Sequence, residues 1–330
     1  MPKILIAQDK PSKALLDTLA QLPHFSPKPL MGGALTPSQL SLMKRVRSKA
    51  FSNAFMYQLI DVKGSPLHKA YWSTYHCSRT ILQVGDKLSS QYCNQRWCMV
   101  CNRIRTAKLM NGYLPSIEAM EEPMLMTLTH RTVSGSHLRA TQAQDIKIFN
   151  NCKRSVERKG LKVVGLRKVE VEVEQDGKFH SHLHVLIDGE VEAYAFVKQW
   201  LKKHPLYTNE KAQDVRPMTD PHELFKYFTK MVTKGKEMDF NPVAMDKVFT
   251  VMKGKRVVQP FGGFTKAVEE DIDPDKGTEL DWRPSKPDDM EIWVHEEAGE
   301  HTDYYNAYGE PLAQVDGRIM DKETLNFISN

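Results

Sequence analysis

The sequence lacks any long hydrophobic run and contains little cysteine. No stretch approaches the roughly 18 consecutive apolar residues of a membrane-spanning helix, and the N-terminus lacks the charged, apolar and small-residue segments of a secretory signal peptide. Only 5 of the 330 residues are cysteine, and nothing indicates an oxidising compartment, so we do not expect a disulfide framework. These absences, with 41% hydrophobic residues, predict a soluble cytoplasmic protein with no membrane partner, built as one large domain or two modest ones.

Acidic side chains are concentrated at one end of the chain. Residues 267–330 contain 18 acidic and 5 basic side chains, which gives this segment a net charge of −13 and leaves +18 on residues 1–266. A basic body is typical of proteins that bind the phosphate backbone of a nucleic acid, and an acidic appendage can shield that surface or bind a partner. An ordinary charged surface is the alternative interpretation.

Four of the five cysteines lie close together in the sequence. They are Cys77, Cys93, Cys98 and Cys101. The spacing of Cys98 and Cys101 is that of a knuckle in which two thiolates bind one tetrahedral ion, and the other two cysteines complete a four-thiolate set. The pattern predicts a structural Zn²⁺ site. Cys152 stands apart on an expected helix, and we interpret it as a small buried hydrophobic residue.

Arginine and aromatic residues accompany the cysteines. The segment contains Arg79, Arg96, Arg103, Arg105, Tyr75, Tyr92 and Trp97. Guanidinium groups can bind a DNA backbone, and aromatic rings can stack on bases. A solvated module surface is the alternative for these side chains.

Residues 179–187 are the stretch around which we interpret the rest of the chain. Their valine, leucine and isoleucine content and their alternation predict a β-strand, in which successive side chains point to opposite faces. His180, His182 and His184 then share one face, while the aliphatic residues take the other. Two imidazoles on alternate residues of one strand can bind a single cation. The alternative is a polar strand face that happens to carry histidines.

The register of a hairpin decides which acidic residue can join these histidines. A two-residue loop before the histidine strand would place Val171 opposite His182 and turn the glutamates away. A three-residue loop with Gly177 in the left-handed conformation would place Glu170 opposite His182. Glycine at the third loop position is what the second register requires, so we favour that register.

A carboxylate therefore completes the predicted metal site. We expect His182, His184 and Glu170 to bind a divalent cation, with Glu172 and His180 as alternative third ligands. Two imidazoles and a carboxylate favour Mg²⁺ or Mn²⁺ with open coordination positions over a closed structural zinc.

Residues 221–234 predict an amphipathic helix with ionisable groups on its polar face. That face carries Glu223, Tyr227, Lys230 and Lys234. A phenol is a weak nucleophile, but a lysine and a metal-bound phosphate nearby lower the free energy needed to form the phenolate. Lys230 or Lys226 can neutralise charge that develops on an attacked phosphate. A solvated tyrosine is the alternative interpretation.

Several ordered stretches resemble one family of enzymes. They are MTLT at 126–129, RKVEV at 167–171, HSHLHVLI at 180–187 and ELFKYFTK at 223–230, with the cysteine segment, residues 214–216 and residues 253–264. In this order they resemble the motifs of HUH endonucleases, and specifically the single-tyrosine rolling-circle replication initiators of small bacterial plasmids. The resemblance covers residues 70–266 and departs from the family pattern at Met99, where proline is usual.

The resemblance implies a metal-dependent DNA endonuclease and strand transferase. It implies that His182 and His184 bind the metal, that Tyr227 is the nucleophile and that Glu223 activates water in termination. Nicking at a plasmid origin through a 5′-phosphotyrosyl intermediate would leave a 3′-hydroxyl primer. The implied partners are single-stranded and origin duplex DNA and the host replication machinery, namely a helicase, a polymerase and a single-strand-binding protein.

The expected fold is α+β: an antiparallel sheet with the histidine strand at its centre, flanked by helices as in HUH endonucleases, with a zinc-binding module inserted before it. We expect helices at 105–119 and 134–160 and strands at 124–130, 161–174 and 179–187. The predicted divisions are an N-terminal lead-in with a basic helix (1–65), the zinc module (66–105), the nicking and joining domain (106–266) and an acidic extension (267–330).

Two other functions fit the same residues. A transposase or a conjugative relaxase would share the HUH site and differ in its partners, and the genetic context would separate it from a replication protein. A non-catalytic zinc-containing DNA-binding protein would use the histidine strand only as structure. A covalent protein–DNA adduct would exclude this last function.

Overall fold

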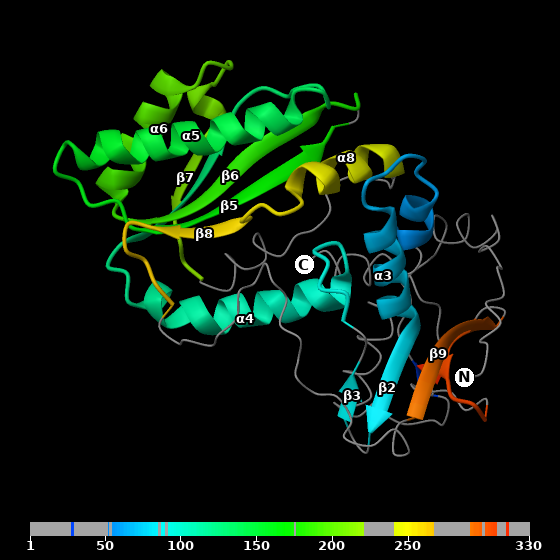
Figure 1. Ribbon diagram of the computed structural model, residues 1–330. Coiled ribbons are helices and arrows are strands. Elements are labelled where there is room, and N and C mark those ends of the chain that lie inside the picture. The colour runs from blue at the N-terminus through cyan, green and yellow to red at the C-terminus, as the bar shows by residue number, and fades with distance from the viewer. Residues whose placement is uncertain are drawn as a thin grey trace. The chain divides into compact units, whose positions relative to one another are not determined.

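The computed structural model describes most of the middle of the chain and parts of its C-terminal segment. The described residues are 28–29, 52, 55–84, 87–89, 92–174, 176–220, 241–266, 291–298, 301–308 and 315–316. The chain divides into two compact units, Asn102–Thr278 and a unit formed by Met1–Cys101 with Glu279–Asn330 (Figure 1). Within the described ranges, no helix is both long and apolar enough to cross a membrane.

An antiparallel sheet forms the centre of the unit Asn102–Thr278. Its strands are β4 (Pro123–Thr129), β5 (Gly165–Val173), β6 (Phe179–Asp188), β7 (Asp214–Pro217) and β8 (Val258–Phe261). They lie in the order β7-β4-β6-β5-β8, and every neighbouring pair is antiparallel. The central strand is β6, which carries the three histidines. The predicted α+β class with an antiparallel sheet is confirmed.

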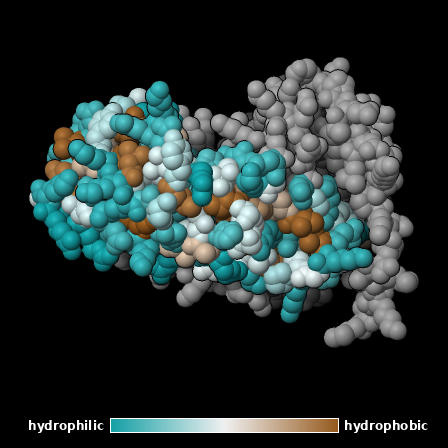
Figure 2. Space-filling model, turned by 90° about the horizontal axis from the view of Figure 1, so that it is seen from above, coloured by the Kyte–Doolittle hydropathy of each residue, from teal (hydrophilic) through white to brown (hydrophobic). Residues whose placement is uncertain are grey.

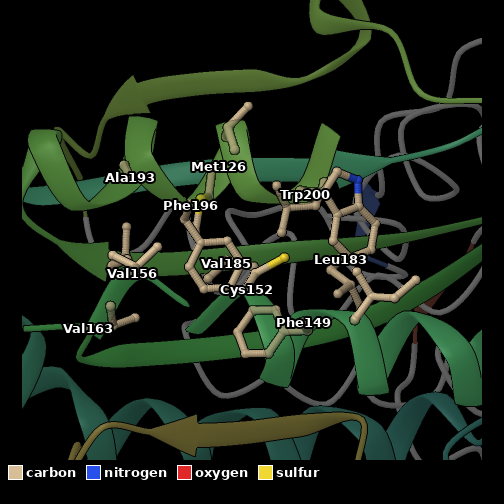
Figure 3. Close-up of a cluster of buried hydrophobic side chains, with 14 of the residues drawn as sticks. Met126, Phe149, Cys152, Val156, Val163, Leu183, Val185, Ala193, Phe196 and Trp200 are labelled. Carbon is tan, nitrogen blue, oxygen red and sulfur yellow. The ribbon is translucent and has the colours of Figure 1, made fainter. Parts of the chain in front are cut away.

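Helices cover both faces of this sheet (Figure 1). The helical elements of the unit are α4 (Met99–Glu118), α5 (Leu138–Glu157), α6 (Glu190–Lys203), the short 3₁₀ helix η1 (Glu210–Ala212) and α8 (Pro242–Met252). On one face α5 and α6 enclose the larger core, in which Phe149, Phe196 and Trp200 pack against Leu183 and Val185 of β6 (Figure 3). On the other face α4 packs on Leu125, Leu166 and Leu186. Each face of β6 is therefore fixed by a separate apolar cluster.

Local sequence explains where these helices form. The buried positions of α5 recur at helical spacing, and the last of them that face the core are Phe149, Cys152 and Val156. Cys152 is fully buried, as expected for a small hydrophobic residue. Helix α8 begins after Asn241, whose Oδ1 accepts the Ala244 N–H at 3.0 Å. The helix thus starts where a cap is available.

The other unit combines an internal segment with the C-terminal strands. Its elements are α3 (His68–Arg79), β2 (Thr80–Val84), β3 (Lys87–Ser89), β9 (Glu291–Ala298) and β10 (His301–Tyr305), with the short pair β1 (Lys28–Pro29) and β11 (Val315–Asp316). The larger sheet has the order β10-β9-β2-β3, in which Ile81 of β2 lies opposite Trp293 of β9. Both Trp293 and Tyr304 are buried, and the Tyr304 hydroxyl donates to the Ser78 carbonyl. Part of the acidic segment therefore belongs to the core of this unit.

The observed boundaries differ from the predicted ones in two informative places. Helix α4 begins at Met99 and not at residue 105, because the chain turns directly from the cysteine knuckle into the helix. Strand β5 begins at Gly165 and not at residue 161, because α5 is followed by a turn that includes Gly160, with φ +85°.

The molecular surface offers little contiguous apolar area on the face seen in Figure 2. That face is mostly hydrophilic, and its hydrophobic patches are small and separated by polar residues. Val191 and Tyr194 of α6 are exposed at 64% and 53%, but isolated apolar residues of this kind are ordinary for a protein surface.

Candidate metal sites and active site

The β5–β6 hairpin sets the positions of the candidate metal ligands. Gly177 has φ +74°, in the left-handed region, and its N–H donates to the Glu174 carbonyl at 2.9 Å. The Glu174 N–H donates in turn to the Lys178 carbonyl at 2.8 Å. Pairing therefore follows the register predicted for a three-residue loop, with Glu170 opposite His182.

Three side chains come together on one face of the central strand. They are Glu170, His182 and His184, which we call the acid–histidine cluster. Glu170 Oε2 lies 3.0 Å from His184 Nε2 and 3.7 Å from His182 Nε2. The side chains are only 8%, 7% and 15% exposed, in the order Glu170, His182, His184. Their ligand atoms all lie within 4.8 Å of one another, close enough to bind one ion.

The charge states of this cluster suit a cation. Burial disfavours the ionised form of Glu170, but the positive charge of Lys168 and hydrogen bonds from the two histidines outweigh it and hold the pKa of Glu170 well below its usual value. Burial lowers the pKa of His184, so its imidazole is neutral at neutral pH. The cluster therefore presents an ionised carboxylate and a neutral imidazole to the same point.

The Nδ1 atoms of His182 and His184, which are the ring nitrogens that do not face Glu170, have different surroundings. His184 Nδ1 lies 3.2 Å from Thr127 Oγ1, which orients the ring and leaves Nε2 for a ligand when Nδ1 carries the proton. His182 Nδ1 is buried without a hydrogen-bond partner in the described part of the chain. This atom lies on the other side of the ring from Nε2, the nitrogen that faces Glu170, so it does not mark the shared ion position. The fit to a cation comes from the donor set: one carboxylate oxygen and the Nε2 atoms of two imidazoles converge on the same point. The residues present therefore fit a metal ion.

A second group of ligands shares His182. Glu172, His180 and His182 also have ligand atoms within 4.8 Å of one another. His180 is more exposed, at 28%, and burial of its ring still lowers its pKa. Its Nε2 makes a close hydrogen bond to Thr129 Oγ1. Glu170 is the more deeply buried of the two carboxylates, but Glu172 and His180 stay open as alternative ligands.

The four clustered cysteines meet in space. Cys77 Sγ lies 3.8 Å from the sulfur atoms of Cys98 and Cys101, and Cys93 Sγ lies 3.7 Å from that of Cys101. All four are free thiols, and hydrogen bonds among them raise the pKa of Cys98 well above its usual value. A cation that binds the four sulfurs would displace these protons. The cysteine cluster is therefore a second candidate metal site.

Neighbouring groups support the knuckle. The backbone N–H of Met99 donates to Ser52 Oγ at 3.0 Å, a bond that the proline usual at this position could not make. The indole N–H of Trp97 donates to Thr74 Oγ1 at 3.0 Å, and this oxygen lies 3.5 Å from Cys93 Sγ. The departure at Met99 is thus accommodated by a local contact.

The structure corrects the interpretation of the residues around the cysteines. Tyr75, Trp97 and Arg105 are only 5%, 4% and 7% exposed. The expectation that they contact DNA is wrong, because these side chains are buried. The exposed aromatic residue of the segment is Trp72, at 38%, which the sequence did not single out.

The predicted nucleophile and its neighbours lie outside the described residues. Tyr227, Glu223 and Lys230 all fall within residues 221–240, for which no structure is described. Their assignment stays a prediction based on the sequence and on the resemblance.

Sequence analysis missed a group of ionisable side chains on the other face of the sheet. His130, Asp145 and His204, which we call the buried His–Asp cluster, have side chains at most 1% exposed. Asp145 lies 3.3 Å from His130 Nε2 and 3.1 Å from His204 Nε2, and it accepts the Ser181 hydroxyl at 2.9 Å. Asp145 lies on the apolar face of α5. A carboxylate among the apolar positions of a helix is the sequence feature that could have indicated a buried ionic cluster.

Hydrogen bonding determines the protonation of this buried cluster. His130 Nδ1 lies 2.7 Å from the Arg131 carbonyl, so it donates there, and Nε2 must also carry a proton to face Asp145. His204 Nδ1 accepts the Leu206 N–H at 3.3 Å, so its Nε2 donates to Asp145. Protons thus occupy the positions where a metal would bind. Although the ligand atoms lie within 4.8 Å of one another, the geometry favours an ion pair.

The buried ion pair predicts a pH-dependent stability. Burial alone would lower the pKa of His130, but Asp145 outweighs it and raises that pKa. His130 therefore contributes stability that is complete below about pH 6.5, its unfolded pKa, and that is lost as the pH rises through its higher folded pKa. We expect Asp145→Asn to lower the free energy of unfolding by about 3–5 kcal/mol near pH 6 and by less near pH 9.

Urea unfolding of the wild type and of Asp145→Asn across this range measures the effect. His137→Gln, which changes an exposed histidine next to α5, is the matched control and should show no such pH dependence. An equal loss of stability at both pH values would contradict the assignment of His130 as the charged partner.

Comparison with known protein families identifies the family of this chain. A family model described as Replication protein, Rep_1, matches residues 86–306, about two thirds of the chain, and the chain therefore belongs to this family of rolling-circle plasmid replication proteins. Membership implies a plasmid replication initiator that binds DNA and has nuclease activity in general. No curated protein and no solved structure matches the chain.

Proposed function

We propose that this protein nicks one strand of a plasmid origin with Tyr227, forms a 5′-phosphotyrosyl intermediate and leaves a 3′-hydroxyl that primes rolling-circle synthesis. The observation that carries the proposal is the acid–histidine cluster on the central strand of a member of the Rep_1 family. An ester to tyrosine conserves the energy of the broken phosphodiester, so a later 3′-hydroxyl can reverse the transfer.

His182, His184 and Glu170 would hold Mg²⁺ or Mn²⁺, with Glu172 or His180 as alternative ligands. A bound divalent ion would polarise a non-bridging phosphate oxygen and orient the scissile phosphate. The protein prepares this site in two ways. Glu170 is kept ionised by its neighbours, and Thr127 orients the His184 ring.

Three residues outside the described ranges would carry the covalent chemistry. The Tyr227 oxygen attacks phosphorus, the 3′ oxygen leaves with a proton, and Lys230 neutralises charge on the phosphate. After one round, Glu223 would take a proton from water that attacks a second phosphate, so that the protein is released.

We further propose that the cysteine cluster binds a structural Zn²⁺. Four ligands about 2.3 Å from a central zinc stand about 3.8 Å apart in a tetrahedron, and the measured sulfur separations are 3.7 and 3.8 Å. Four thiolates leave no open coordination position, so this ion would stabilise the fold and take no part in nicking.

The proposed partners are single-stranded and duplex origin DNA, followed by a host helicase, a polymerase and a single-strand-binding protein that extend the nick. Incubation with single-stranded origin DNA and Mn²⁺, followed by denaturing electrophoresis, tests the central step. We expect a protein band that retains DNA after denaturation and loses it on nuclease digestion. Origin binding with no covalent adduct would instead support a non-catalytic DNA-binding protein.

A further inference from the structure

A buried lysine lies against the acid–histidine cluster. Lys168 is in β5, two residues before Glu170 on the same face, and it pairs with His184 in the register of the hairpin. Its Nζ lies 3.0 Å from Glu170 Oε2, the same oxygen that faces both histidines, and its side chain is 4% exposed. A lysine so deeply buried is uncommon unless it is paired, so its position calls for an explanation.

The charge balance of the site changes when a metal binds. Without metal, the Lys168 ammonium and the Glu170 carboxylate compensate each other's charge at a separation of 3.0 Å. With a divalent cation bound, the cation and the Lys168 ammonium contribute three positive charges, while Glu170 and the neighbouring Glu172 contribute two negative ones. Buried charges that are not compensated are unfavourable, so the metal-loaded site needs another anion. A phosphodiester of single-stranded DNA is the anion that the proposed function supplies.

We infer that Lys168 makes metal binding and DNA phosphate binding depend on each other, an inference that rests on the proposed function. The ammonium competes with the cation for Glu170 in the free protein, which weakens metal binding. When a phosphate is present, the excess positive charge is neutralised and both ligands bind more tightly. Because such coupling is reciprocal, the metal also strengthens phosphate binding. Lys168 is thus a positioning residue for the metal and the scissile phosphate.

The experiment measures Mn²⁺ affinity from the electron paramagnetic resonance signal of free Mn²⁺, with and without a decathymidylate oligonucleotide. All proteins carry Tyr227→Phe, so that no turnover occurs, and Mn²⁺ bound by the oligonucleotide alone is subtracted. The work is done at pH 8, well above the ordinary pKa of a glutamate, about 4.3. The variants are Lys168→Gln, Lys168→Met and Lys168→Arg, and Lys178→Gln removes an exposed lysine of the same hairpin as a control.

Removal of the Lys168 charge should have opposite effects on the two measurements. We expect Lys168→Gln to bind Mn²⁺ alone about tenfold more tightly than the parent, an effect within the roughly 5- to 150-fold usual for coupled sites. We also expect this variant to lose most of the increase in Mn²⁺ affinity that the oligonucleotide causes in the parent. Lys168→Met should behave in the same way, while Lys168→Arg and Lys178→Gln should resemble the parent.

Two results would overturn the inference. One is equal or weaker Mn²⁺ binding by both neutral variants, and the other is an undiminished response to the oligonucleotide. If one neutral variant does not fold, judged by circular dichroism, the other decides. Failure of the proposed function would give a different result. Adding His182→Ala to the parent would then leave Mn²⁺ binding unchanged, and the wild type would form no covalent adduct with DNA.

Discussion

Tyr227→Phe is expected to abolish both the nick and the covalent protein–DNA adduct. The substitution removes one oxygen and leaves the aromatic ring and the amphipathic pattern of residues 221–234 unchanged, so loss of activity is not readily explained by misfolding. Binding to origin DNA should stay near the wild-type affinity, because contacts from lysine, arginine and metal to phosphate are retained. Denaturing electrophoresis and a filter-binding titration on the same preparation measure the two properties.

Tyr194→Phe is a suitable control for this variant. Tyr194 is 53% exposed on α6, and its hydroxyl has no role in the proposed reaction. It should nick as fast as the wild type. Nicking by Tyr227→Phe at a rate close to that of Tyr194→Phe would eliminate the tyrosine mechanism, whatever the acid–histidine cluster binds.

Glu223→Ala should fail at a different step. The first nick and the 5′-phosphotyrosyl adduct should still form, since Tyr227 is intact. Hydrolysis that frees the protein should slow by on the order of 10²–10⁴ if Glu223 is the general base. Adduct should therefore accumulate over time in this variant and turn over in the wild type.

Truncation after Lys266 is expected to unfold the cysteine-containing unit and to abolish binding of the proposed zinc. The truncation removes β9 and β10, and with them the partner of β2 and the buried side chains of Trp293 and Tyr304. Truncating one such buried aromatic to alanine typically costs about 3–5 kcal/mol, which is a large part of the stability of an ordinary domain. Removal of negative charge would by itself tighten DNA binding, but loss of the unit should dominate.

Zinc content by atomic absorption and circular dichroism measure this effect. Truncation after Tyr308 is the matched control, because it retains β9 and β10 while shortening the same acidic segment. That protein should keep a full equivalent of zinc. If the chain ending at Lys266 also keeps its zinc and its fold, the C-terminal strands are dispensable to the cysteine cluster.

The sequence was sufficient to predict the hairpin because a local rule determines it. Gly177 at the third loop position selected one of two registers, and that register brought Glu170 to His182. The buried polar groups could not be predicted in this way. Lysine and aspartate are usually exposed, so Lys168 and Asp145 would be expected at the surface. Only their tertiary neighbours show that they are buried and paired.

The pairing of strands that are far apart in the sequence could not be predicted either. The C-terminal acidic residues suggested a separate extension, yet β9 pairs with β2. Nothing local to either strand identifies its partner, since strand pairing across a large sequence separation depends on the whole fold. For the same reason Tyr75 and Trp97 could not be recognised as core residues from their spacing alone.

The pairing of β2 with β9 also determines the order in which the two units can fold during translation. Roughly 200 residues separate the two strands, so a ribosome that adds 5–20 residues per second completes β9 about 10 to 40 s after β2. The unit Asn102–Thr278 is complete in the growing chain before β9 exists. During translation the sheet with the acid–histidine cluster can therefore form first, whereas the unit that contains the cysteines can be completed only after the C-terminal strands have been synthesised.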